Sequence, residues 1–160
     1  MHLMLQKMDL QNEYDKDKII ELKNKLVMSK IITENEANAI DINKILNFTK
    51  TEFAKKIANA KAVFKEKPFY ININASELLN EEVDEKILVQ GIIDLYYIDE
   101  NDNVVLVDYK TDYVKEGKEL VEKYRKQLEI YKKALEIALN KKVEKVYIYS
   151  LWLNQEILVD

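Results

Sequence analysis

The stretch GIIDLYYIDENDNVVLVDYKTD, residues 91–112, contains two runs of β-branched and aromatic residues separated by a short polar segment rich in turn-forming residues. This pattern predicts a β-hairpin. If residues 100–102 form the loop, counting back along both strands sets Asp94 opposite Asp108. Residues that face each other on antiparallel strands have Cβ atoms about 4.5–5.5 Å apart. The hairpin therefore predicts two carboxylates side by side in a core sheet.

Asp108 and Lys110 are separated by one residue, so their side chains point to the same face of the predicted strand. Two acids at the predicted distance repel and raise each other's pKa, so Asp94 and Asp108 need a cation nearby. Lys110 supplies one positive charge, and Mg²⁺, which is commonly held by one or two carboxylates, would supply the rest. Such a site is suited to hydrolysis of a phosphodiester, in which Lys110 orients water and stabilises developing charge. The alternative is an ordinary strand end with surface salt bridges and no metal dependence.

The composition excludes several kinds of chemistry. With no cysteine, the chain has no disulfide, cysteine-ligated zinc, iron–sulfur cluster or thiol nucleophile, and it suits a reducing cytoplasm. No apolar run approaches the ~20 residues of a membrane span, so we expect no membrane partner. The start, MHLMLQKMDL, is too short for a signal peptide.

The formal net charge of −4 gives no overall reason to expect nucleic acid, but the charge is unevenly distributed. Residues 110–145 hold eleven Lys and Arg against seven Asp and Glu, whereas residues 1–109 hold fourteen against twenty. A mildly basic segment thus begins at the Asp-x-Lys pair. A solvated, lysine-rich helix face would give the same pattern.

The chain of 160 residues, with two glycines and one proline, has no linker and is predicted to be a single domain. Periodicity predicts helices first and strands later. The predicted helices are 2–9, 14–30, 33–46 with a Thr33–Glu36 capping box, 51–60 and 118–140, and the predicted strands are 63–75, 86–99, 103–111, 143–153 and 156–160. This order predicts an α/β fold with a mixed central sheet flanked by helices, a helical part over about 1–60 and an αβ core over about 61–160.

Four segments in this order resemble the PD-(D/E)XK nucleases of the RecB-like branch. Residues 91–112 resemble the core, with a first Asp and a later Asp-x-Lys on adjacent strands. FKEKPFY, residues 64–70, is similar to the preceding Glu-x-Pro-Phe strand, YRKQLEIYKKAL, residues 124–135, to the following Gln-x-x-x-Tyr helix, and HLMLQKMD, residues 2–9, to the helix with a metal-binding histidine. Together they resemble most the C-terminal nuclease domains of AddA-type helicase–nuclease proteins, which implies a restriction-endonuclease-like core.

The resemblance implies roles for the residues of the hairpin. Asp94 and Asp108 would be metal ligands, the backbone carbonyl of Tyr109 a further ligand, and Lys110 the catalytic lysine. The expected ion is Mg²⁺, with Mn²⁺ as the alternative.

Four other positions match the family's motifs outside the hairpin. Glu66 would be an acid facing the active site, although Pro68 also suits an exposed edge strand. Gln127 and Tyr131 lie on one helix face and would be near the site and the DNA, although packing also explains Tyr131. His2 would bind the metal ion through its imidazole.

The resemblance implies a metal-dependent DNA exonuclease domain of a bacterial helicase–nuclease that processes double-strand breaks for recombinational repair. Its expected partners are DNA, the helicase portion of the parent chain and an AddB-like second subunit, in the cytoplasm at the nucleoid. The chain has no Gly-x-x-x-x-Gly-Lys-Thr segment, so we expect no ATP site in it. One alternative is a catalytically silent module of the same fold that docks DNA or a partner protein, and another is a purely structural domain.

Overall fold

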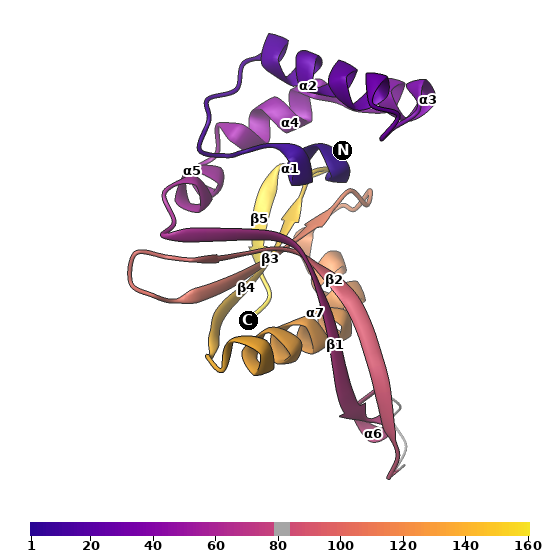
Figure 1. The fold of residues 1–160 in the computed structure, drawn as a ribbon, viewed down its shortest axis with the longest axis vertical. Coiled ribbons are helices and arrows are strands. Elements are labelled where there is room, and N and C mark those ends of the chain that lie inside the picture. The colour runs from indigo at the N-terminus through magenta and orange to yellow at the C-terminus, as the bar shows by residue number, and fades with distance from the viewer. Residues whose placement is uncertain (79–83) are drawn as a thin grey trace.

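A computed structural model describes residues 1–78 and 84–160 and contains a five-stranded sheet in the order β1-β2-β3-β4-β5 (Figure 1). The strands are β1 (Ala62–Asn74), β2 (Lys86–Ile98), β3 (Val104–Lys110), β4 (Val143–Ser150) and β5 (Gln155–Leu158). All neighbours are antiparallel except β3 and β4, which are parallel. The predicted mixed sheet is confirmed.

Helices cover both faces of this sheet. They are α1 (His2–Lys7), α2 (Lys16–Met28), α3 (Glu34–Asn38), α4 (Ile42–Thr49), α5 (Glu52–Ala58), α6 (Ala75–Leu78) and α7 (Gly117–Leu139). One apolar core packs α1–α5 against one face, and a second packs α7, the crossover between β3 and β4, against the other (Figure 1). Within residues 1–78 and 84–160, none of the helices has the length and apolar character needed to cross a membrane.

The predicted helix over residues 33–46 is wrong in one respect, because the structure divides it into α3 and α4. Its start is as predicted, with a capping box between Thr33 and Glu36. Asp41 then ends the run, since its side chain accepts the amides of Asn43 at 3.0 Å and Lys44 at 3.2 Å and caps a new helix. An aspartate that bonds the following amides begins a helix and does not continue one.

A kink crosses β1 and β2 at Glu66. This residue has a φ of 50°, in the left-handed region that side chains other than glycine rarely adopt. Phe64 and Phe69 both pack on the α7 side, although strict alternation would place them on opposite faces. On β2 the same reversal falls between Ile93 and Tyr96, which also both pack on the α7 side. The two strands therefore bend together, and the bend is where β2 leaves β3.

Gly91 in β2 allows the sheet and α7 to approach closely. A Cβ at this position would lie 2.7 Å from ring carbons of Phe69 and 3.3 Å from a ring carbon of Tyr131. Those rings are themselves in edge contact, with centroids 5.2 Å apart. The glycine therefore helps to set the position of the helix that carries Tyr131.

We predict that Gly91→Ala lowers the free energy of unfolding by about 1–3 kcal/mol, because the added methyl group overpacks the interface with α7. Urea unfolding measures the change. Gln90→Ala is the matched control, since the neighbouring Gln90 is exposed. Equal stability of Gly91→Ala and the wild type would contradict this packing.

Candidate active site

The site begins where the hydrogen-bonded pairing of β2 and β3 ends. The last pair is Leu95 with Val107, in the register that a loop of residues 100–102 predicted. One step further in the same register come Asp94 and Asp108. Both side chains are buried, with residue exposures of 8% and 2%. Two carboxylates thus lie at the fork between the two strands.

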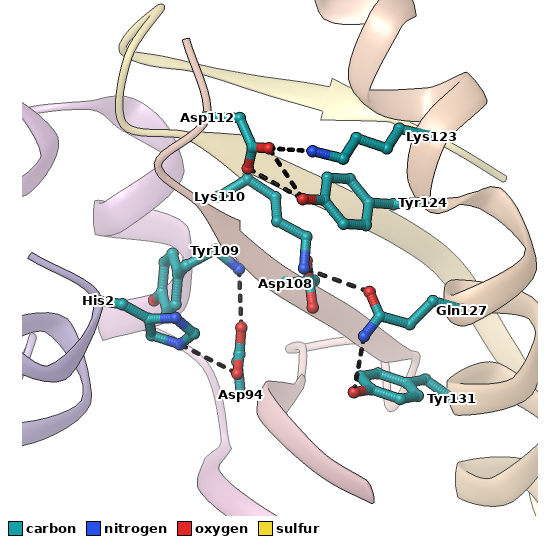
Figure 2. A network of polar contacts seen from close by, with 10 residues as sticks. All are labelled: His2, Asp94, Asp108, Tyr109, Lys110, Asp112, Lys123, Tyr124, Gln127 and Tyr131. Carbon is teal, nitrogen blue, oxygen red and sulfur yellow. Dashed lines mark hydrogen bonds and ion pairs between the residues drawn. The ribbon is translucent and has the colours of Figure 1, made fainter.

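Asp94 joins three elements (Figure 2). Its Oδ2 accepts the backbone amide of Tyr109 on β3 at 3.0 Å, so a side chain replaces the main-chain pairing at the fork. Its Oδ1 lies 3.0 Å from Nε2 of His2, the first residue of α1. The Tyr109 ring packs into the core below α1–α5, with its centroid 5.9 Å from that of His2. The first helix is thereby brought to the fork.

Asp108 forms an ion pair with Lys110, whose Nζ lies 2.7 Å from Oδ2. Burial raises the pKa of Asp108 to about 6 from an ordinary value of 3.8, although the Lys110 charge lowers it. The negative charge of Asp94 adds to the rise, as the sequence predicted, but loss of hydration is the larger cause. Near neutral pH the fork therefore holds a carboxylate that is costly to ionise.

Helix α7 positions the Lys110 ammonium from the other side (Figure 2). Lys110 Nζ donates to Oε1 of Gln127 at 3.3 Å, and Nε2 of Gln127 donates to the Tyr131 hydroxyl at 3.0 Å. The same ammonium lies 4.1 Å from the ring centroid of Tyr124, a cation–π contact. Gln127 and Tyr131 are thus brought to the site, in a chain of contacts that leads from α7 to Lys110.

Sequence reasoning missed Asp112 and took Tyr124 only as part of the apolar helix stripe. The Tyr124 hydroxyl donates to both carboxylate oxygens of Asp112, at 2.9 and 3.1 Å, and Lys123 pairs with the same carboxylate (Figure 2). These bonds fasten the segment after Lys110 to α7. The available signal was the spacing of Tyr124, three residues before Gln127 on one helix face.

Glu66 is the one predicted site residue that the structure does not join to this network. It sits across from Asp94, since its neighbours Lys65 and Lys67 pair with the residues on either side of that aspartate. Its carboxylate instead accepts from Lys7 Nζ at 3.3 Å, with both side chains about 40% exposed. Glu66 therefore contacts the end of α1, the helix whose start carries His2.

The donor atoms at the fork suit a hard divalent cation. In the part of the chain that the structure describes, His2 Nε2 and Asp108 Oδ2 are buried without a hydrogen-bond partner, although each has an oppositely charged neighbour. No group of three His, Asp or Glu side chains among those residues forms a metal cage by itself. Mg²⁺ does not need one, because it is commonly held by one or two carboxylates together with water and a substrate phosphate. Two acidic ligands fit that mode of binding.

Comparison with known proteins agrees with this geometry. The family model described as the PD-(D/E)XK nuclease superfamily matches residues 1–154. The chain belongs to this superfamily, and the predicted resemblance and restriction-endonuclease-like fold are confirmed.

The similar curated proteins are named as one of the subunits of an ATP-dependent helicase/nuclease. The chain is 44% identical to the one from Thermoanaerobacter sp. (strain X514) over 164 residues, which cover 99% of this chain and 13% of that protein. Identity to the Clostridium kluyveri protein (strain ATCC 8527) is 41%, over 93% of this chain and 12% of that protein. Identity to the Clostridium botulinum protein (strain Hall) is 38%, over 100% of this chain and 13% of that protein. The chain thus spans about an eighth of the length of these relatives.

We predict that Asp108→Asn raises the free energy of unfolding of the metal-free protein by about 2 kcal/mol at about pH 7.5. The folded-state pKa of about 6 lies above the ordinary 3.8, so the folded protein destabilises the carboxylate as pH rises through this window. At or below about pH 4 the acid is largely protonated in both states, and the gain disappears.

Urea unfolding in EDTA at both pH values measures this difference. The exposed Asp84, changed to Asn, is the matched control. If Asp108→Asn is no more stable than the wild type at the higher pH, the buried charge is not destabilising and this electrostatic account is wrong.

Proposed function

We propose that residues 1–160 form one metal-dependent DNA nuclease domain that hydrolyses phosphodiesters as an exonuclease. The observation that carries this proposal is the pair of buried acids, Asp94 and Asp108, at the fork between β2 and β3, with the Lys110 ammonium 2.7 Å from Asp108. Membership of a nuclease superfamily supports the same chemistry.

The proposed ligands of the cation are the carboxylates of Asp94 and Asp108, the backbone carbonyl of Tyr109 and Nε2 of His2. Mg²⁺ is the proposed ion, with Mn²⁺ as the alternative, because the donors are carboxylate, carbonyl and imidazole. When bound, the cation would neutralise negative charge on the phosphate and lower the pKa of an attacking water.

Lys110 is the proposed catalytic lysine. Its ammonium can donate to the water or to a phosphate oxygen and so stabilise the charge that grows in the transition state. Gln127 and the Tyr124 ring hold Nζ against α7, and Tyr131 in turn orients Gln127. Glu66, by binding Lys7, is proposed to position α1 and hence His2.

At the level of the parent protein, we propose a part in a helicase–nuclease that processes double-strand breaks for recombinational repair. The relatives' description as helicase/nuclease proteins and their greater length support this proposal. The proposed partners are DNA, the helicase portion of the parent chain and an AddB-like protein, in the bacterial cytoplasm at the nucleoid. The alternative is a silent docking module that binds DNA or a partner protein without cleaving.

We expect the purified chain to cleave labelled single-stranded DNA in Mg²⁺ or Mn²⁺ but not in EDTA. Lys110→Ala should lower the rate by about 10²-fold or more, because charge on the phosphate then lacks its stabilising donor. Lys25→Ala, on an exposed position of α2, is the control for loss of one positive charge. DNA binding without metal-dependent cleavage would favour the docking module and contradict the nuclease proposal.

We expect His2→Ala to weaken Mn²⁺ binding by about ten-fold, because the imidazole next to Asp94 is removed. Isothermal titration calorimetry measures this affinity directly. Lys7→Ala is the matched control on the same helix, since it removes the contact with Glu66 and leaves the imidazole in place. Unchanged affinity in His2→Ala, or an equal loss in both variants, would contradict a direct role for the imidazole.

A further inference from the structure

Two exposed aromatic rings stack beside the site without belonging to either core. Tyr113 is 73% exposed and Trp152 is 43% exposed, and their ring centroids are 4.5 Å apart at an interplanar angle of 60°. The ammonium of Lys44, from α4, lies 3.6 Å from the Trp152 ring centroid. We call Tyr113, Trp152 and Lys44 the aromatic platform.

The platform is next to Lys110 through the sheet. Tyr113 follows Lys110 by three residues, a span of at most about 11 Å. Trp152 follows Ser150 by two residues, and Ser150 is the partner of Lys110 in the register of β3 and β4. The amide of Leu151 also donates to the carbonyl of Lys110 at 2.9 Å. Both rings therefore extend from the strand ends that carry the catalytic lysine.

Packing does not account for the position of these rings. Neither Tyr113 nor Trp152 is among the residues of the two apolar cores. The Lys44 cation over the Trp152 face adds a positive charge to an aromatic surface that is open to water. Exposed aromatic faces with a lysine beside them are what proteins use to stack unpaired bases and hold the adjoining phosphates.

We propose that the aromatic platform binds single-stranded DNA by stacking bases on the open face of Tyr113, with Lys44 close to the backbone. The bases of a duplex already cover each other's faces, so an unpaired strand is the form of DNA that offers a free face. A strand held there would run toward Lys110 and the acids at the fork. This inference rests on the proposed function for its substrate, but its binding test does not depend on catalysis.

Trp152 is the only tryptophan of the chain, so its fluorescence reports on the platform directly. We expect oligothymidylate added to the wild-type chain in EDTA to quench Trp152 fluorescence in a saturable way. Tyr113→Ala should weaken binding by about ten-fold, and Tyr113→Phe, which keeps the ring, should bind as the wild type does. Because Tyr113 is mostly exposed, these variants should fold, and circular dichroism checks that they do.

A blunt duplex of the same length should quench much less than the single strand. Unquenched Trp152 fluorescence, or wild-type affinity in Tyr113→Ala, would overturn the platform even if the chain cleaves DNA in Mg²⁺. Quenching that Tyr113→Ala weakens would support the platform even if cleavage is absent and the nuclease proposal fails. The two proposals can therefore fail separately.

Discussion

The hydrogen bond from the Tyr109 amide to the Asp94 carboxylate, 3.0 Å long, is the contact around which the site is built. It lies at the point where β2 leaves β3, and the strained backbone of Glu66 bends the neighbouring β1 at the same level. Without the fork, a main-chain ladder would continue past Asp94 and Asp108. With it, α1 and α7 reach the two acids from opposite sides of the sheet, through His2 and through the contacts of Lys110.

Burial gives the site its chemistry and also destabilises the fold. An acid that is 2% exposed and has a second acid beside it disfavours its own charge, as the raised pKa of Asp108 shows. Lys110 compensates in part, and a divalent cation would complete the compensation. The same few groups therefore account for a cost in stability and for the affinity proposed for a metal ion. Strain at functional sites of this kind is common in proteins.

The sequence predicted what local rules determine. The length of the 100–102 loop set the register that leads to Asp94 and Asp108, and periodicity located the strands and α7. The break at Asp41 was missed because helical spacing continues across it, and the kink at Glu66 because its φ depends on neighbours distant in sequence. The link from Tyr124 to Asp112 needed the crossover geometry of α7, which no pattern within either segment reveals.

The most direct test of the central claim is the anomalous diffraction of Mn²⁺ soaked into crystals of the chain. We predict one strong peak at the fork between β2 and β3, at coordination distance, about 2.0–2.5 Å, from carboxylate oxygens of both Asp94 and Asp108. A peak bound by only one of them would leave the pair without its proposed purpose. No peak at the fork, with Mn²⁺ bound elsewhere, would contradict the claim that these acids form a metal centre.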